Sequence, residues 1–260
     1  MPNYPKTLER DYRRALRQRV ANVERATRYA FDKWLEWGAG DAINERARTD
    51  SAGSDAEQAK SIIRRVRTAY DATYTTAKDL DLASETFERV DGYTYRGIKR
   101  EYAAAVGVEP LINADTRQVA AQFVAENVAL IQDLPTKQLA QIEADVVQAI
   151  ESGQRAEAIS KAIRERSGMA RRRADLIARD QMGKAVSQLN QKRMQSLGVD
   201  KYIWRTVGDE RVRDEHAERD GEMFSWSEPP EDGHPGEPIN CRCSAEPVLD
   251  DVLSDLGIEI

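Results

Sequence analysis

The chain has 260 residues, of which 40% are hydrophobic and 32% charged, and its formal net charge is -6. No run approaches the roughly 18 to 20 apolar residues of a membrane-spanning helix, and residues 1–6 lack the apolar core of a signal peptide. We therefore expect a protein that works inside a cell and has no membrane contact. Cys241 and Cys243 are one residue apart, a separation that strains a disulfide, so we expect both to be reduced.

The charge is strongly segregated along the chain. Residues 1–33 carry nine Lys/Arg against four Asp/Glu, and residues 160–200 carry ten against four. Residues 209–260 hold four basic and sixteen acidic groups. This polarity favours an approach of the basic segments to an acidic partner. The alternative is that these charges belong to the solvated faces of ordinary helices.

The first predicted element is a helix from Lys6 to Trp37. Its apolar residues recur every three or four positions and form one stripe; they are Leu8, Tyr12, Leu16, Val20, Val23, Ala30 and Trp34. Gly38 and Gly40 end this helix. The small, polar residues 44–53 predict a loop or flexible link.

A second helix begins at Ser54-Asp55, which can cap its N-terminus, and runs through Tyr70. Residues 82–100 include Gly92 and Gly97, so we predict a broken helix there. Pro110 separates this half of the chain from the next.

Four further helices are predicted between residues 113 and 197. Asn113 can cap the first, which ends at Leu134-Pro135 because the residue before a proline is pushed out of the helical region. The next runs from Thr136 to Gly153. A short helix at 154–166 ends before Gly168, and a longer one at 169–197 is closed by Gly198 in a left-handed cap.

The sequence changes character after Gly198. Tyr202–Val207 is β-branched and aromatic and predicts a strand, and Phe224 and Trp226 alternate as a second short strand. Five prolines between 229 and 247 argue against long regular elements there. The predicted fold is mainly α, an elongated helical body followed by a small α+β C-terminal module with short strands. We divide it into an N-terminal helical region (1–110), a helical lead-in (111–199) and a His/Cys-containing module with an acidic tail (200–260).

Every histidine and cysteine of the chain lies within residues 216–243. His216, His234, Cys241 and Cys243 are the ligand types of a structural zinc site. So small a module, rich in proline and glycine, buries too little apolar area to fold firmly alone, and a metal would stabilise it. Two alternatives stay open: hydrogen-bonded histidines beside two small buried cysteines, and, with less support, a reactive cysteine next to Arg242.

A metal-dependent hydrolase is a further alternative. Asp209, Glu210, Asp214 and Glu215 precede His216, and carboxylates with a histidine serve hydrolytic metal sites or general-base catalysis. The acidic sign of this segment disfavours a phosphodiester substrate. No phosphate-binding loop, dinucleotide fingerprint, serine-hydrolase or zinc-protease motif appears in the sequence.

Other residues of the module indicate turns and core. Asp209 follows the predicted strand and can accept hydrogen bonds from backbone N–H groups two residues on, while Arg211 and Arg213 would pair with neighbouring carboxylates. Asp220-Gly221 is a second turn signal. The aromatic residues Trp204, Phe224 and Trp226 are interpreted as the core of the module.

The same residues resemble a known family. The matching order is Ile203-Trp204-Arg205-Thr206, Asp209-Glu210-Arg211-Val212-Arg213, His216, Asp220-Gly221, His234-Pro235, Asn240-Cys241-Arg242-Cys243 and Ala245-Glu246-Pro247-Val248. It resembles the Mu F-like phage head-morphogenesis domain of minor head proteins. Upstream, Ile159 to Ile163, Gly168, Arg173-Ala174 and Ile177-Ala178-Arg179 resemble the helical lead-in of that domain. The resemblance covers roughly residues 150–249.

The resemblance implies a minor head (capsid) protein of a tailed phage, with a structural role and no catalysis. Such a protein is expected in the virion, inside the capsid near the portal, and in the host cytoplasm during assembly. The partners implied are the portal protein and the major capsid protein, and a homo-oligomer around the portal is compatible with them. The cofactor expected is a structural Zn²⁺ or none, since family membership does not require a metal.

The basic segments carry a second hypothesis, a nucleic-acid-binding virion protein that contacts packaged DNA. Its candidate residues are Arg10, Arg13, Arg14, Arg17, Arg171, Arg172 and Arg173. Phosphate contacts of this kind would make the affinity for DNA fall steeply with salt.

Overall fold

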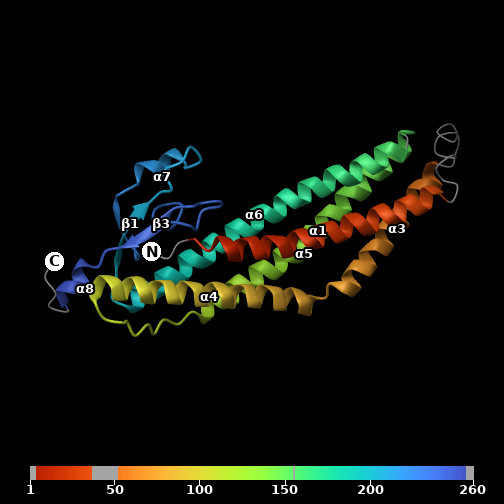
Figure 1. The fold of residues 1–260 in the computed structure, drawn as a ribbon. Helices are drawn as coiled ribbons and strands as arrows, with labels where there is room; N and C mark the ends of the chain where they lie inside the picture. The colour runs from red at the N-terminus through yellow and green to blue at the C-terminus, as the bar shows by residue number, and fades with distance from the viewer. Residues whose placement is uncertain (1–3, 37–51, 155, 256–260) are drawn as a thin grey trace. The chain divides into compact units, whose positions relative to one another are not determined.

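A computed structural model describes residues 4–36, 52–154 and 156–255 of the chain (Figure 1). Five long helices come first: α1 (Lys6–Trp34), α3 (Ala52–Thr73), α4 (Thr76–Val106), α5 (Arg117–Glu151) and α6 (Ala156–Ser196). They are followed by β1 (Lys201–Arg205), α7 (Asp214–Glu218), β2 (Met223–Ser225), β3 (Ser244–Pro247) and α8 (Asp250–Asp255). The predicted fold class, mainly α with a small α+β module after the helices, is confirmed. None of the described helices has an 18-residue stretch apolar enough to cross a membrane.

The chain folds into two compact units, each assembled from segments distant in the sequence. One comprises Met1–Tyr12, Leu82–Asn127 and Ala178–Ile260, and the other comprises Arg13–Asp81 and Val128–Ile177. Because α1, α4, α5 and α6 each contribute residues to both units, the units cut across the predicted ranges 1–110, 111–199 and 200–260.

In its described part, the unit built from Arg13–Asp81 and Val128–Ile177 has helices as its only regular elements, and one apolar core holds it together. The four helices α1, α3, α5 and α6 each turn one apolar face to this core, which follows from their three- and four-residue spacing. The core residues include Val23 and Phe31 of α1, Ile62 and Val66 of α3, Ile142 and Val146 of α5, and Ile159 and Ile163 of α6.

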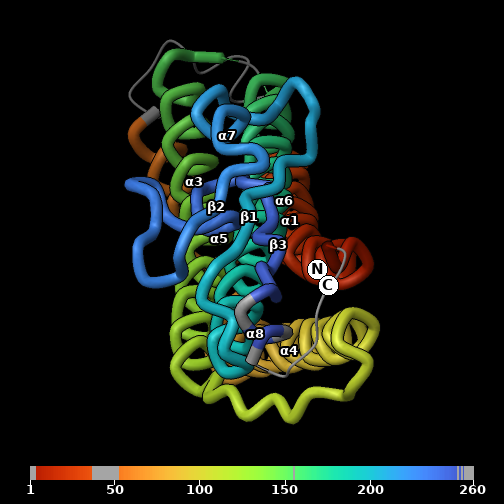
Figure 2. The backbone as a smooth tube through the Cα atoms, turned by 90° about the vertical axis from the view of Figure 1, so that its left-hand side faces the viewer, coloured from red at the N-terminus to blue at the C-terminus, as the bar shows by residue number. Residues whose placement is uncertain are grey.

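The other unit contains the sheet (Figure 2). β1 is its central strand, paired antiparallel with β2 on one side and β3 on the other. Tyr202 and Trp204 lie two residues apart on β1, so their side chains point to the same face of the sheet, and both are fully buried. Ile98 of α4, Met194 of α6 and Val252 of α8 join them in the core of this unit.

The helix break predicted at Leu134-Pro135 is wrong. α5 runs continuously through Pro135, which lies inside it. The proline nitrogen cannot donate to the carbonyl one turn back, a loss that costs about 3 kcal/mol. Ile131, Leu134 and Ile142 are all buried on the same side of α5, and this packing stabilises one helix across the proline.

The break predicted before Gly168 is also wrong, because α6 continues through it. A Cβ atom at Gly168 would meet only the Arg172 guanidinium, at 3.9 Å, so no close contact requires a glycine there. Ile163, Ala170 and Ala174 are buried on one helix face. Their burial offsets the cost of about 1 kcal/mol for a glycine inside a helix.

Residues 82–100 form part of the unbroken helix α4, contrary to the predicted break. Val90, Thr94 and Ile98 are fully buried at four-residue intervals. The Thr94 hydroxyl donates to the Val90 carbonyl at 3.0 Å, within the same helix. A continuous buried face therefore outweighs the two glycines, Gly92 and Gly97.

Several helix ends differ from prediction by a few residues. α5 begins at Arg117, where the Asp115 carboxylate accepts the backbone N–H of Arg117 at 3.0 Å, rather than at Asn113. α3 begins at Ala52, so Ser54 and Asp55 lie in its first turn instead of capping it. Trp37, Gly38, Gly40 and residues 44–51 of the predicted loop lie outside the described residues.

Two predicted helix caps are confirmed. Gly153 and Gly198 have φ angles of 67° and 78°, the left-handed conformation that glycine adopts without steric cost. After Gly198, the Val199 N–H donates back to the Met194 carbonyl at 3.0 Å and closes the end of α6. Only residues 197–200 separate α6 from β1.

Candidate metal centre

His216 lies on α7, a helix of five residues, and is its only buried residue. Its side chain is 2% exposed and packs edge-on against the ring of Trp204, with ring centroids 5.1 Å apart. Since Trp204 belongs to the central strand β1, the imidazole is held against the face of the sheet that forms the core.

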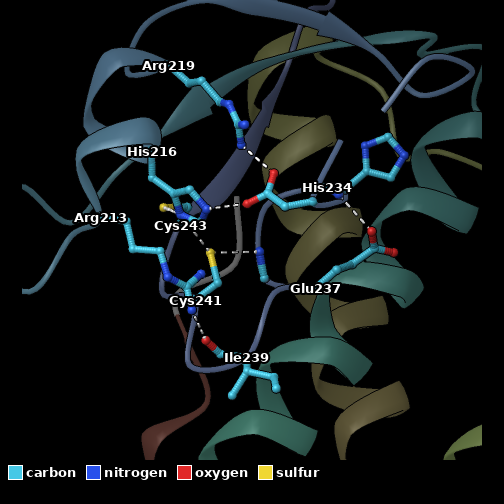
Figure 3. A network of polar contacts seen from close by, with 10 residues as sticks. Arg213, His216, Arg219, His234, Glu237, Ile239, Cys241 and Cys243 are labelled. Atoms are coloured by element: carbon cyan, nitrogen blue, oxygen red, sulfur yellow. Dashed lines mark hydrogen bonds and ion pairs between the residues drawn. The ribbon is translucent and has the colours of Figure 1, made fainter. Parts of the chain in front are cut away.

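Cys241 and Cys243 come just before β3, and their sulfur atoms converge on His216 (Figure 3). Each Sγ lies 3.5 Å from His216 Nδ1. A turn in which the Cys241 N–H donates to the Pro238 carbonyl, at 2.9 Å, positions the first cysteine. The segment that leads into β3 is extended, and residues two positions apart in an extended chain point to the same side. The two thiols therefore lie on the same side of this segment.

The other nitrogen of His216 is held by an acid. Nε2 lies 2.8 Å from Oδ2 of Asp232, whose Oδ1 accepts a hydrogen bond from Arg219 at 2.6 Å. Burial opposes ionisation of Asp232, but the hydrogen bonds from His216 and Arg219 outweigh it and lower its pKa. With Nε2–H donated to this carboxylate, the lone pair of Nδ1 points to the two sulfurs.

The pKa values of the two thiols are shifted in opposite directions. The hydrogen bond from Cys243, together with the backbone N–H of Gly236 at 3.3 Å, lowers the pKa of Cys241 to about 6. The pKa of Cys243 is raised, first because its proton is held by Cys241 and second because it is buried. Two cysteine sulfurs beside an imidazole nitrogen are a donor set that binds zinc and other borderline-soft metals.

The structure does not bring His234 to this group, so its prediction as a fourth ligand is wrong. Its Nδ1 lies 2.9 Å from the Tyr202 phenol oxygen and its Nε2 lies 3.3 Å from the Gln191 side-chain nitrogen. The ring is 4% exposed and packs on Trp226, and Figure 3 shows it turned away from the sulfurs. Among the described residues, only His216, Cys241 and Cys243 form a cluster with metal-binding geometry. His234 is the core histidine of the alternative interpretation.

Asp209, in the segment after β1, contacts the arginine between the two cysteines. Its carboxylate accepts hydrogen bonds from both terminal nitrogens of Arg242, at 2.7 and 2.5 Å, and from the backbone N–H of Arg211 at 3.1 Å. The predicted turn at Asp209 is therefore confirmed. Because Arg242 lies between the two cysteines, this ion pair ties the segment after β1 to the cysteine loop.

The remaining motif residues hold the backbone in place. Arg213 donates to the Ile239 carbonyl at 2.7 Å, not to a carboxylate as predicted. The Arg211 side chain is exposed, and no carboxylate partner is recorded for it within the described ranges. Asp220 accepts the Thr206 N–H at 2.8 Å, and Gly221, with φ of 85°, donates its N–H to the Trp204 carbonyl at 2.9 Å, so the turn predicted there is confirmed.

The carboxylates of the hydrolase alternative do not reach the cluster. Asp209 is engaged by Arg242, and Glu210, Asp214 and Glu215 are exposed. Asp232 is the acid that contacts His216, and sequence reasoning missed it. Nothing in the sequence distinguishes it from the other fifteen acidic groups of residues 209–260.

The arginines of the DNA hypothesis differ in their surroundings. Three of them form ion pairs within the unit of Arg13–Asp81 and Val128–Ile177: Arg17 with Asp175, Arg171 with Glu24, and Arg173 with Asp133. Arg13 is half-buried, whereas Arg10, Arg14 and Arg172 are exposed, and no ion pair is recorded for these three among the described residues. A phosphate group would compete least with carboxylates at Arg10, Arg14 and Arg172.

Fold and site together define a helical protein that ends in a small three-stranded module built around a His/Cys cluster. Residues 140–246 match the family model described as phage Mu protein F like protein. This match, over about two fifths of the chain, supports the Mu F-like phage head-morphogenesis family. The resemblance drawn from the sequence motifs is confirmed.

A relative matches the chain over a longer stretch. An uncharacterized protein of Haemophilus influenzae is 32% identical over 207 residues, which are 77% of this chain and 46% of that protein. The chain therefore spans about half the length of the curated relative it matches. No solved structure is significantly similar to it.

Proposed function

We propose that the chain is a minor head protein of a tailed phage, which joins the head during assembly and remains in the virion, inside the capsid near the portal. The observation that carries this proposal is the Mu F-like domain at residues 140–246. That domain takes in the end of α5, the whole of α6 and the module up to β3. Before incorporation the protein would be in the host cytoplasm.

The partners in this proposal are the portal protein and the major capsid protein, and a face of α6 supports it. Met169 and Leu176 are two helical turns apart, so they lie on the same face, and they are 44% and 39% exposed. Arg172 and Arg173, also exposed, lie between them on that face. Two large apolar side chains beside arginines are typical of the anchors of a protein–protein interface.

The proposed role is structural. The cavity lined by Cys241 and Cys243 has a volume of about 70 Å³, whereas sites for small-molecule substrates measure roughly 300–1,000 Å³. This difference favours a protein that binds other proteins over one that turns over a substrate at the cluster.

The test uses the phage genome that encodes this chain. With the gene deleted, we expect loss of infectious heads, and complementation by the wild type should restore them with the protein present in purified particles. The Met169→Glu/Leu176→Glu variant should fail to complement and fail to capture the portal protein in a pull-down. Leu80→Glu is the matched control, because Leu80 is a similarly exposed residue on α4 at 48%. Normal heads without the protein would overturn the proposal.

Contact with packaged DNA is a second candidate, favoured by the exposed Arg10, Arg14 and Arg172. Binding of duplex DNA should weaken steeply as salt rises. Replacing Arg14 and Arg172 by glutamine should lower both the affinity and the slope of this salt dependence. Arg17→Gln with Arg173→Gln is the control, since both of those arginines are already paired with carboxylates. Affinity that does not change with salt would exclude this candidate.

A further inference from the structure

We propose that His216, Cys241 and Cys243 bind one Zn²⁺ ion through three protein ligands, with a water molecule as the fourth. His216 would bind through Nδ1 and each cysteine through Sγ. The proposal rests on the geometry of these side chains and does not depend on a role in the phage head.

The distances between the ligand atoms fit a tetrahedral zinc ion. Zinc–sulfur and zinc–nitrogen bonds of about 2.3 and 2.0 Å at the tetrahedral angle separate the two ligand atoms by about 3.5 Å. His216 Nδ1 lies 3.5 Å from each sulfur, and all three ligand atoms lie within 4.8 Å of one another. Two sulfurs and an imidazole exclude magnesium and calcium, which prefer oxygen ligands.

The groups around the ligands are those that a zinc site uses. Metal-bound histidines donate their second nitrogen to a carboxylate, which fixes the ring and strengthens the ligand. The Asp232 carboxylate occupies this position at 2.8 Å from His216 Nε2, and Arg219 holds it from the other side. The backbone N–H of Gly236, at 3.3 Å from Cys241 Sγ, is oriented to stabilise a bound thiolate.

We assign the fourth position to water because the other histidine of the chain is engaged elsewhere. Both ring nitrogens of His234 already have partners, Tyr202 and Gln191. The cavity lined by Cys241 and Cys243 has a volume of about 70 Å³. It has room for a water molecule, whose share of the liquid is about 30 Å³.

A metal at this place would have a structural effect. His216 lies on α7 and the cysteines precede β3, so one ion would connect two segments 25 and 27 residues apart in the sequence. The module has few regular elements: three strands of three to five residues and one short helix precede α8. Zinc would supply folding free energy that so small a core lacks.

The first test is metal analysis of the full-length protein purified without chelator. We expect about one equivalent of zinc, and about one equivalent of Co²⁺ after exchange, with the visible spectrum of a tetrahedral Co²⁺ ion and sulfur-to-cobalt charge transfer from two thiolates. Both cysteines should resist thiol reagents until a chelator is added. A wild-type protein without zinc that also fails to take up Co²⁺ would overturn the proposal, and this measurement requires no variant.

Variants then identify the ligands. Cys241→Ser, Cys243→Ser and His216→Asn should each lose most of the bound zinc, and each serine variant should lose half of the charge-transfer intensity where Co²⁺ still binds. His234→Gln should keep its zinc. Loss of the ion from His234→Gln, in protein that is still folded by circular dichroism, would exclude the three-ligand site.

Asp232→Asn tests the carboxylate behind the histidine. We expect zinc affinity about 10- to 100-fold lower, the usual effect of removing such a partner. Asp214→Asn is the matched control, because Asp214 is an exposed aspartate on the same short helix as His216. Equal affinities for Asp232→Asn and the wild type would show that His216 does not bind metal through Nδ1 in this orientation.

Discussion

The Nδ1 atom of His234 lies 2.9 Å from the phenol oxygen of Tyr202, in a buried pair beneath the central strand of the sheet. With the Gln191 side-chain nitrogen facing Nε2, the hydrogen bonds fit a neutral imidazole that carries its proton on Nδ1. Burial lowers the pKa of His234, although Glu237 nearby acts in the opposite direction. His234 is therefore a core residue and not a metal ligand, and its lowered pKa makes the stability of the core depend on pH.

Acidification should therefore destabilise the protein through His234. Its pKa in the folded state is below the unfolded value of about 6.5, so above that pH neither state gains a proton at this site. As the pH falls below about 6.5, the unfolded state takes up a proton that the folded state resists, and the free energy of unfolding decreases.

The measurement compares the wild type with His234→Gln by urea unfolding from pH 7.5 to 5, with chelator present throughout. At pH 7.5 the variant should be less stable by about 1–3 kcal/mol, because buried partners lose a hydrogen bond. The difference should narrow as the pH falls, since only the wild type titrates at this position. A constant difference across the range would contradict a lowered pKa.

Gly236 and Gly183 offer a matched pair for the packing of the cysteine loop on α6. Gly236 has φ of 93°, and an added Cβ would lie 3.0 Å from the Ser187 Cβ and 3.2 Å from the Gly183 carbonyl oxygen. Gly236→Ala should therefore cost about 1–3 kcal/mol of unfolding free energy. A Cβ at Gly183 would meet carbonyl oxygens at 3.6 Å, an ordinary contact.

Gly183→Ala should be neutral or stabilise the protein by up to about 1 kcal/mol, because alanine is the better helix former. Urea unfolding of both variants under the same conditions measures the contrast. Equal losses of stability in the two variants would mean that the loop is not packed on α6 as described.

The buried ion pair of Arg19 and Asp79 should make the helical unit sensitive to single substitutions. The two side chains are 6% and 4% exposed, with an N–O distance of 2.5 Å, and the Arg19 guanidinium also lies over the Tyr74 ring. Asp79→Leu alone should cost about 3–5 kcal/mol, because it leaves a buried charge without its partner.

The double variant Arg19→Met/Asp79→Leu should recover most of that loss, since it buries no charge. A double-mutant cycle by chemical denaturation checks this. Additive losses in the two single variants would show that the two charges are not coupled.

The ion pair of Asp209 and Arg242 should support the metal centre without forming it. Its two side chains are 32% and 44% exposed, and pairs in such contact with solvent contribute little. Arg242→Ala should lower zinc affinity by no more than a few-fold, measured by competition with a chelating dye. Arg211→Ala is the control, because it leaves the backbone N–H that Asp209 accepts. A loss of zinc affinity as large as that caused by Cys241→Ser would mean that Arg242 positions the ligands directly.

Local patterns in the sequence were enough to locate most of the elements. Apolar periodicity predicted α1 and α3, glycine chemistry predicted the caps at Gly153 and Gly198, and aromatic and β-branched residues predicted β1. The order of the motif residues was enough to find the resemblance to the Mu F-like family, whose model matches residues 140–246. These features depend on residues close together in the chain, or on their order alone.

Only the tertiary structure decided which of these residues meet. Pro135 and Gly168 predict helix ends, yet both lie inside helices, because packing along a whole helix face outweighs the local cost of either residue. His216 and His234 are the same residue type, and only the contacts of Asp232 with one and Tyr202 with the other separate a candidate ligand from a core side chain. Asp232 and Tyr202 are 16 and 32 residues from the histidines they bind, a relationship that no local pattern in the sequence encodes.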